Sequence, residues 1–112
     1  MCLFCQIASK EIPSKTVFED DDLFAFHDIR PGAPVHVLVV PKRHITGLPE
    51  ATAEDRELLG KMLLSAKRVA DATGIAQGGY RVVFNVGPDA GQSVFHVHMH
   101  VLGGRPLSWP PG

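Results

Sequence analysis

Residues 91–105 read GQSVFHVHMHVLGGR, and three histidines, His96, His98 and His100, alternate there with apolar residues. A spacing of two is the period of a β-strand, in which successive side chains point to opposite faces. The pattern predicts a strand over residues 94–102, with the imidazoles on one face at steps of about 6.6 Å. The apolar side chains then occupy the other face. Strict alternation of three histidines is hard to explain by ordinary core or surface positions.

Four further segments have the β-branched and aromatic composition of strands. The last of them is joined to the histidine strand by residues 87–91, a Gly- and Pro-containing link short enough for an antiparallel pair. The others are separated by an acidic turn at 20–22 and a Pro/Gly turn at 31–34. The four segments are Val17–Glu19, Leu23–Ile29, Val35–Pro41 and Gly79–Val86.

One long helix is expected between the third and fourth of these strands. Thr52 is a good N-cap, Asp55 supplies the acidic half of a capping box, and Gly74 provides the C-terminal stop. A second, short helix is expected over Leu3–Ser9. The sequence therefore predicts a single α+β domain over residues 1–112. It has a five-stranded antiparallel sheet and one main helix, and residues 106–112 form an irregular tail. The apolar stripe of the main helix consists of Leu59, Met62, Leu63, Ala66, Val69 and Ala70.

The composition excludes several classes of protein. Hydrophobic residues make up 45% and charged residues 21% of 112 residues, with a formal net charge of −1. This is ordinary for a soluble globular domain and predicts neither a nucleic-acid partner nor a membrane segment. Cys2 and Cys5 are too close to staple a fold, and the N-terminus has no secretory pattern. The expected location is the reducing cytoplasm.

The chemistry of the histidine stretch has two functional interpretations. His-x-His on a strand can present two nitrogens to zinc, and a third histidine could complete such a site. Alternatively, one imidazole is a nucleophile and its neighbours handle charge and protons, which suits attack on phosphorus near pH 7. The spacing alone does not choose between these two interpretations.

The whole chain resembles the histidine triad (HIT) family, specifically its Hint branch of purine nucleoside phosphoramidate hydrolases. Residues 91–105 carry the signature of that family. Four other segments are similar to the same branch and occur in the same order: Glu11–Ser14, Ala25–Ile29, Pro41–His44 and Trp109–Gly112. The resemblance implies a HIT-like fold and hydrolysis through a nucleotidyl-histidine intermediate, with release of a nucleoside monophosphate and an amine.

The resemblance also assigns roles to individual residues. His98 is the nucleophile, flanked by His96 and His100, and His44 approaches the triad from the side. Asp28 accepts the ribose hydroxyls, as an acceptor-only carboxylate can. Contacts to the phosphate or the leaving group fall to Ser93, Gln92 and Asn85. The purine slot is formed by Phe4, Ile7, Phe26 and Ile29, with His27 counted among the nucleotide contacts.

The chemistry implied by the resemblance requires no cofactor, but a structural zinc is a further expectation. Some histidine triad proteins hold zinc with a Cys-x-x-Cys pair and two histidines, which here match Cys2, Cys5, His44 and His96. A Cys₂His₂ set is chemically apt for tetrahedral zinc. Two small residues without a metal and a redox pair remain the alternatives for the cysteines.

The resemblance finally implies a homodimer that takes a small purine nucleotide. In the family, each C-terminal tail reaches the partner's active site, which would place Trp109 beside the partner's phosphate site. Three other interpretations compete with the phosphoramidate hydrolase. They are a dinucleoside polyphosphate hydrolase of the Fhit-like branch, a purine-nucleotide-binding regulatory module, and a protein whose histidines only bind metal.

Overall fold

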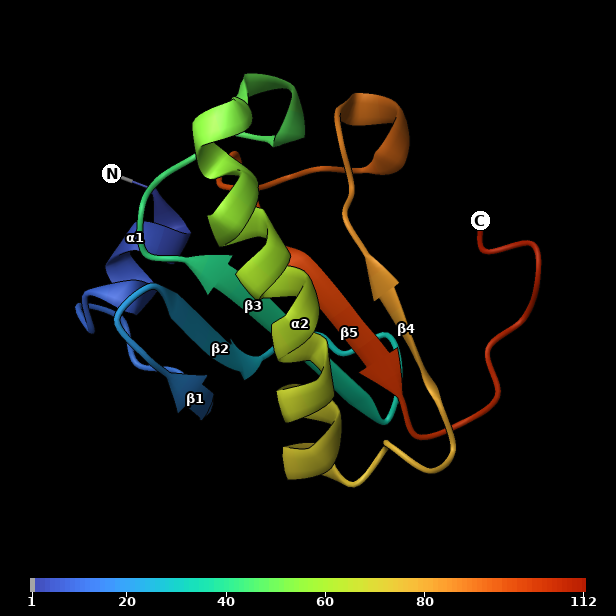
Figure 1. Ribbon diagram of the computed structural model, residues 1–112. Coiled ribbons are helices and arrows are strands. Elements are labelled where there is room, and N and C mark those ends of the chain that lie inside the picture. Colours follow the sequence, from blue (N-terminus) through green and yellow to red (C-terminus); the bar gives the residue numbers. More distant parts are fainter. Residues whose placement is uncertain (1) are drawn as a thin grey trace.

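The sheet is built around β3 (Val35–Pro41), whose β-branched residues favour extended backbone and are almost wholly buried. In this computed structural model, which describes residues 2–112, β3 pairs antiparallel with β2 (Leu23–His27) and β5 (Met99–Gly103). At the two edges, β1 (Thr16–Glu19) pairs with β2 and β4 (Tyr80–Val83) pairs with β5. Over the described residues the result is a five-stranded antiparallel sheet of order β1-β2-β3-β5-β4 (Figure 1).

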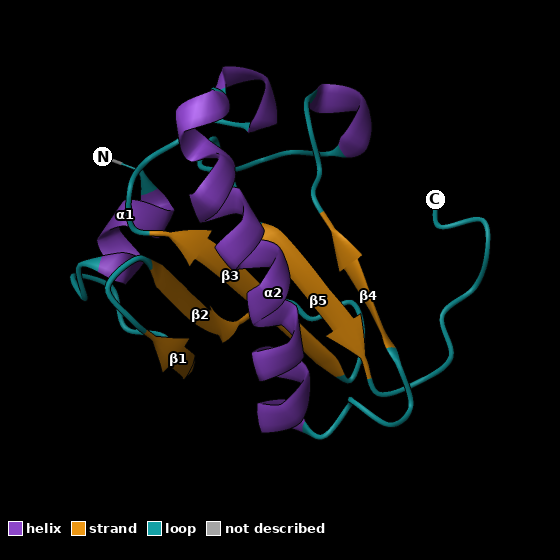
Figure 2. Ribbon diagram, viewed as in Figure 1, coloured by secondary structure: helices purple, strands orange, loops and turns teal. Residues whose placement is uncertain are grey.

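Two helices cover opposite faces of this sheet. Helix α2 (Arg56–Thr73) runs across one face, and the short helix α1 (Leu3–Ala8) lies against the other (Figures 1 and 2). Both hydrogen bonds of the predicted capping box between Thr52 and Asp55 are formed, and a single 3₁₀ turn then leads into α2. The helix ends at Gly74, whose φ of 78° is left-handed and therefore suits glycine.

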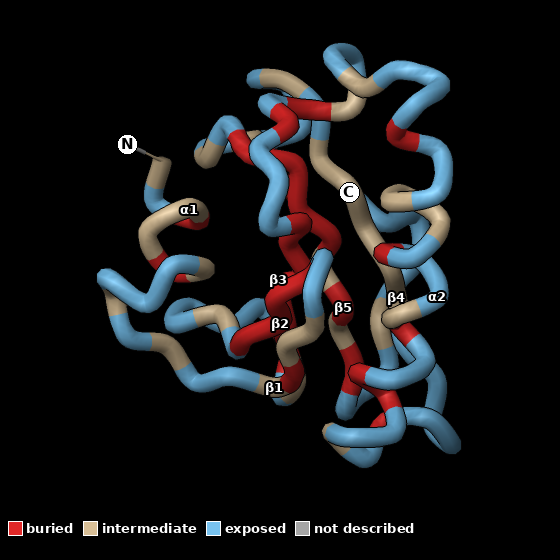
Figure 3. Tube along the Cα trace, turned by 60° about the vertical axis from the view of Figure 1, so that its left-hand side comes forward, coloured by how far each residue is buried: buried red, intermediate tan, exposed pale blue. Residues whose placement is uncertain are grey.

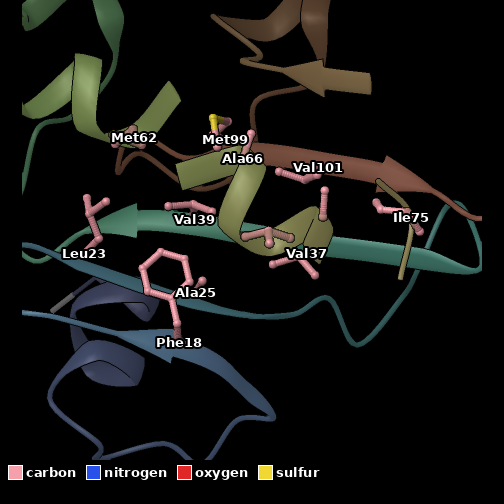
Figure 4. Close-up of a cluster of buried hydrophobic side chains, with 12 residues drawn as sticks. Phe18, Leu23, Ala25, Val37, Val39, Met62, Ala66, Ile75, Met99 and Val101 are labelled. Carbon is pink, nitrogen blue, oxygen red and sulfur yellow. The ribbon is translucent and has the colours of Figure 1, made fainter. Parts of the chain in front are cut away.

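Alternation along the strands sorts the apolar side chains into two clusters, and Figure 3 shows the buried central strands between their covers. The cluster beneath α2 is the larger, and the strands supply alternate residues to it (Figure 4). Its members include Val37, Val39, Met62, Ala66, Val69, Met99 and Val101. The cluster beneath α1 consists of Phe4, Ile7, Phe24, Phe26, Leu38 and Val40. Among residues 2–112, no helix has both the length and the apolar character needed to cross a membrane.

The α+β class, the antiparallel sheet and the two helices confirm the prediction from sequence, but several boundaries differ. Leu63, placed on the apolar stripe of the main helix, is 54% exposed. The predicted strand 23–29 ends at His27, and the predicted strand 79–86 is reduced to β4. The largest difference concerns the histidine strand. It was expected over residues 94–102 and begins only at Met99.

Pro41 accounts for this late start. If the register that pairs Val39 with Met99 continued for two more residues, Pro41 would lie opposite Val97. Proline has no N–H for the ladder, and the Pro41 carbonyl is already taken by the His96 ring, whose Nε2 lies 2.7 Å away. The amide of Val97 instead donates to the carbonyl of Ile45 at 2.6 Å. Both backbone bonds that would extend β5 are therefore lost at Pro41.

The tight packing around Gly103 makes a testable prediction about stability. An added Cβ would lie 2.8 Å from Ile75 Cδ1 and 3.2 Å from the Gly79 carbonyl oxygen. We expect Gly103→Ala to lower the free energy of unfolding by about 1–3 kcal/mol, the cost of overpacking. Urea denaturation measures it. The matched control is Gly60→Ala on α2, where a Cβ meets nothing within 4 Å and helix propensity should add about 0.5–1 kcal/mol. Equal changes in the two variants would contradict the packing argument.

Candidate active site

Only one of the three histidines of the motif lies on a β-strand. His100 lies on β5, whereas His96 and His98 lie in the irregular segment just before it. The three residues before Met99 are nevertheless all buried, with His96, Val97 and His98 at 0%, 3% and 7% exposure. The rings of His98 and His100 are 5.0 Å apart, and Phe4 of α1 meets the His98 ring edge-on at 4.9 Å. These rings therefore face the α1 side of the sheet.

One ring nitrogen of His98 is committed to the backbone. Its Nδ1 lies 2.8 Å from the carbonyl oxygen of His96. A carbonyl can only accept, so Nδ1 carries the hydrogen and the Nε2 lone pair is free. Burial lowers the pKa of His98 below its ordinary value, which favours the neutral ring. His98 thus has the protonation pattern that a nucleophilic imidazole requires.

His36 joins this group, although the sequence analysis gave it no role. It is the second residue of β3, and its Nε2 is 2.8 Å from Nδ1 of His100. The amide of Gly32 donates to the other nitrogen of His36 at 2.9 Å. Burial lowers the pKa of His100 to about 4, and the neighbouring His98 and His36 act in the same direction. The signal that could have found His36 is a single histidine inside an otherwise apolar strand.

A cleft of about 490 Å³ opens beside the triad and is lined by residues of α1, β2 and the loop before His96. The apolar walls include Phe4, Ile7 and Phe26, which are buried, whereas Ile29 at the rim is 93% exposed. His98 and His100 form the polar end of the cleft. Four of the residues predicted to form the purine slot are therefore brought together at one opening.

The polar residues predicted to bind nucleotide fall into different positions. Asp28, His27 and Ser93 line the cleft. Asp28 Oδ1 accepts the Arg30 amide at 2.8 Å, which fixes the carboxylate within its turn. The Asn85 amide nitrogen lies 3.4 Å from His100 Nε2.

Gln92 does not line the cleft and instead connects its own loop to the loop that follows β3. Its side-chain oxygen accepts the Gly87 amide at 3.0 Å. Its side-chain nitrogen lies 3.2 Å from the Thr46 carbonyl and 3.3 Å from the Val94 carbonyl. With these hydrogen bonds made to both loops, Gln92 supports the segment that leads into the triad.

His96 and His44 belong to a second cluster together with both cysteines. One possible ligand atom from each of Cys2, Cys5, His44 and His96 lies within 4.8 Å of the other three. The Nδ1 atoms of the two histidines are 3.1 Å apart, and His96 Nδ1 lies 3.3 Å from Cys2 Sγ and 3.4 Å from Cys5 Sγ. The structure thus places His44 against the ring of His96, at 4.8 Å between centroids, on the side of the cysteines.

The donor set and its surroundings fit a tetrahedral metal. Zinc bonds of about 2.0 Å to nitrogen and 2.3 Å to sulfur imply separations of about 3.3 Å between two nitrogens and about 3.5 Å between nitrogen and sulfur, close to the observed ones. His96 Nε2 lies 2.7 Å from the Pro41 carbonyl and must donate to it, which leaves Nδ1 free for a metal. This outer hydrogen bond is the one that metal-binding histidines ordinarily make.

A second group of possible ligands does not fit a metal by the same test. Asp28, His36 and His100 also offer ligand atoms within 4.8 Å of one another. However, the Gly32 amide donates to His36 Nδ1, so the hydrogen of the neutral ring is on Nε2. That hydrogen occupies the position a metal would need. The two clusters have similar ligands, but they differ in the backbone group that the histidine contacts. A carbonyl beside His96 leaves a nitrogen free for a metal, whereas an amide beside His36 does not.

The C-terminal tail lies outside the cleft of its own chain. Trp109 is 79% exposed, with the Arg81 guanidinium 5.9 Å from the centre of its ring. Arg81 also donates to the Ser108 carbonyl at 3.0 Å, which holds the tail beside β4. In the part of the chain that the structure describes, no residue of the tail lines the cleft at His98. Leu107, Ser108 and Pro111 of the tail instead line a second hollow, which His100 also borders.

Comparison with known proteins identifies the family. The model of the HIT domain matches residues 9–107. An uncharacterised HIT-like protein of Synechococcus elongatus is 53% identical over 110 residues, which cover 98% of this chain and 96% of the relative. The crystal structure of a HIT family hydrolase from Legionella pneumophila superposes with a TM-score of 0.97 at 52% identity, and both chains are covered completely. The chain belongs to the HIT domain family.

Two plant relatives have more informative names. The protein named adenylylsulfatase HINT1 of Arabidopsis thaliana is 50% identical over 98% of this chain and 76% of its own length. A 14 kDa zinc-binding protein of Brassica juncea is 48% identical, with 98% of both chains covered. The family resemblance drawn from the histidine stretch is thus confirmed.

Proposed function

We propose that this protein hydrolyses purine nucleoside phosphoramidates through a nucleotidyl intermediate on His98. The observation that carries the proposal is the hydrogen bond from His98 Nδ1 to the His96 carbonyl, at 2.8 Å. It leaves Nε2 unprotonated in a ring that lines the cleft. Support also comes from relatives, since similar proteins are named HIT family hydrolase and histidine triad nucleotide-binding protein.

The reaction proceeds in two displacements at phosphorus. His98 Nε2 forms a bond to phosphorus while the bond between phosphorus and the amine nitrogen breaks. The departing nitrogen takes a proton from the hydroxyl of Ser93, which lines the same cleft. Water then attacks phosphorus, the bond to the imidazole breaks, and the proton of the water returns to Ser93. The products are a nucleoside monophosphate and a free amine, and His98 is restored.

The cleft selects a nucleoside by shape and by its ribose. A flat purine fits between the apolar side chains of Phe4, Ile7 and Phe26, with Ile29 as a cover at the rim. The Asp28 carboxylate at the same opening accepts hydrogen bonds from the ribose hydroxyls. Apolar walls do not read the edge of a base, so adenine and guanine nucleotides are both accommodated.

An anionic leaving group is a second candidate, favoured by a hollow on the far side of His100. This hollow, of about 380 Å³, is lined by Asn85, His100, Arg81 and Arg105. Two guanidinium groups suit a sulfate or a carboxylate better than an alkyl chain. The Arabidopsis relative named adenylylsulfatase points in the same direction. The same attack by His98 would then release sulfate from an adenylyl sulfate.

Zinc at Cys2, Cys5, His44 and His96 completes the proposal as a structural ion. Four protein ligands leave no open position for water or substrate, so a bound zinc would supply cohesion between α1 and the triad segment and no Lewis-acid chemistry. His96 then serves the active site through its backbone, because its carbonyl holds His98. His44 has a ligand role in this arrangement.

A homodimer is the assembly that explains the exposed groups. Leu63 and Leu64 on α2 are 54% and 70% exposed, and Trp109 is more exposed still. Large apolar side chains gain most when a second surface covers them. A second copy would bury these residues and bring its own Trp109 to the cleft at His98.

His98→Asn tests the proposed nucleophile. We expect hydrolysis of an adenosine phosphoramidate to fall by about 10³-fold or more, the scale for removing a nucleophile. Binding of AMP, measured by calorimetry, should survive because the apolar slot and Asp28 are unchanged. Steady-state release of the amine measures the rate, and adenylyl sulfate assayed in parallel decides between the two leaving groups. A variant that retains most of its activity would overturn the mechanism.

Cys5→Ser tests the metal. Protein purified without chelator should contain about one zinc per chain by elemental analysis, since the four ligands form one closed site. The variant should lose both the zinc and several degrees of thermal stability, because zinc binding contributes to folding free energy. Gln6→Ala, on the same helix but outside the ligand set, is the matched control. Unchanged stability and metal content in Cys5→Ser would return the cysteines to a role without metal.

Removal of residues 106–112 tests the tail. The truncated protein should remain a dimer in sedimentation and bind AMP nearly normally, because none of these residues lines the cleft of its own chain. Catalytic efficiency should fall, and the order of preference among phosphoramidates with different amines should change, since Trp109 contacts the leaving group. Trp109→Ala in the untruncated chain distinguishes the effect of the Trp109 ring from that of the rest of the tail. Unaltered leaving-group selectivity in both proteins would leave the tail a purely structural role.

A further inference from the structure

The hydrogen bonds around His36 and His100 form a chain whose direction can be worked out from its first donor. The Gly32 amide is a donor only, so His36 Nδ1, 2.9 Å away, must accept. In a neutral ring the hydrogen is then on Nε2, which lies 2.8 Å from His100 Nδ1. His100 Nδ1 therefore accepts as well, and a neutral His100 carries its own hydrogen on Nε2. One peptide group thus determines the tautomers of two histidines.

The competing partner for the His36 hydrogen is weaker. Asp28 Oδ2 lies 3.6 Å from His36 Nε2, beyond ordinary hydrogen-bonding distance, whereas His100 is at 2.8 Å. Burial lowers the pKa of both rings, and for His100 it reaches about 4. Both imidazoles are consequently neutral near pH 7, so each carries a single ring hydrogen. The chain of donors then runs in one direction only.

The hydrogen at the end of this chain has no acceptor in its immediate neighbour. The side-chain nitrogen of Asn85 lies 3.4 Å from His100 Nε2, and an amide nitrogen is itself a donor. The distance between the two nitrogens exceeds an ordinary hydrogen bond, so the His100 hydrogen remains available to a stronger acceptor, such as an anionic oxygen. Because His98 is 5.0 Å away between ring centres, that oxygen lies beside the phosphorus that His98 attacks.

Arg105 holds the next peptide of the same turn, on the other side of the Gly32 Cα. Its guanidinium donates to the Gly32 carbonyl at 2.9 Å, from a position two residues beyond the end of β5. The turn that contains Gly32 and Pro34 also packs closely against Gly104, because a Cβ on Gly104 would lie 2.9 Å from Pro34 Cβ. The residues that follow the His100 strand therefore restrain the turn that presents the Gly32 amide.

We propose that the Gly32 amide, in a turn restrained by Arg105, forces His36 and His100 into the Nε2–H tautomer, so that His100 donates to a phosphoryl oxygen. Arg105 is then a positioning residue, and His100 stabilises charge that develops as phosphorus is attacked. A neutral imidazole is a suitable donor for this task because it gives up no proton. The identity of the oxygen rests on the proposed function, whereas the tautomers do not.

The tautomers can be measured without any substrate. Nitrogen-15 NMR distinguishes protonated from unprotonated ring nitrogens, so both His36 and His100 of the wild-type protein should show a protonated Nε2 and an unprotonated Nδ1. A protonated Nδ1 on either ring would overturn the proposal. This result stands whether or not the protein hydrolyses phosphoramidates, and a failure of the proposed function is recognised separately by an absence of turnover in the wild type.

Two variants with matched controls test where the pattern originates. Gly32→Pro removes the amide hydrogen, whereas Gly32→Ala keeps it and places a Cβ no closer than 3.7 Å to His36. Arg105→Gln removes the guanidinium, and Arg56→Gln on α2 is its control. We expect both test variants to mix the tautomers and to lower kcat by about 10-fold with KM little changed, since a lost oxyanion donor costs up to about 10²–10³. Unmixed tautomers in both test variants, or equal loss in test and control, would overturn the proposal.

A third comparison remains informative if the Gly32 loop does not tolerate proline. Glutamine at position 36 can still offer an N–H to His100, whereas phenylalanine keeps the ring shape without a donor. His36→Phe should lower kcat by about 10²-fold, the scale for one lost donor, and His36→Gln should recover about 10-fold of that loss. AMP binding by calorimetry should be similar in both variants. Equal kcat values for the two would show that His36 acts only by packing.

Discussion

The hydrogen bond between the His96 ring and the Pro41 carbonyl is the interaction on which the site depends. It occupies the last acceptor of β3, and proline offers no donor, so the ladder between β3 and β5 stops at Met99. The segment before Met99 is thereby released from the sheet, and the rings of His96 and His98 both meet Phe4 of α1. The same bond fixes which nitrogen of His96 is free to face the cysteines. The backbone carbonyl of His96 accepts the hydrogen bond from Nδ1 of His98.

Backbone groups assign the chemistry of the histidines throughout this structure. Carbonyl groups hold Nε2 of His96 and Nδ1 of His98, and each such bond leaves the opposite nitrogen unprotonated. For His36 the backbone group is an amide, which donates to Nδ1, so the hydrogen of the neutral ring is on the opposite nitrogen, Nε2. Either ring nitrogen of imidazole can carry the hydrogen, so the ring can serve as ligand, nucleophile or donor. The backbone group that bonds one nitrogen decides which of these roles the other can take. Neighbouring histidines can therefore have three different roles within one small domain.

Helix α1 links the two halves of the site. It carries Cys5 toward the histidine pair at the cluster and Phe4 against the His98 ring. Six residues form too short a helix to be stable by themselves. Its position depends on the apolar cluster beneath it and, in the function proposed here, on the metal. A change at the cysteines should therefore displace Phe4 and alter the cleft beside His98.

The sequence by itself determined the α+β class, the order of the elements and the family, because these follow from local periodicity, capping residues and one dense motif. The period-two histidines, the capping box at Thr52 and the left-handed Gly74 are all satisfied within a few residues along the chain. Only the tertiary structure decided which histidines meet. His36 is 64 residues from His100, and Cys2 is 94 residues from His96. Such contacts depend on strand register and on single backbone donors and acceptors, and neither leaves a periodic trace in the sequence.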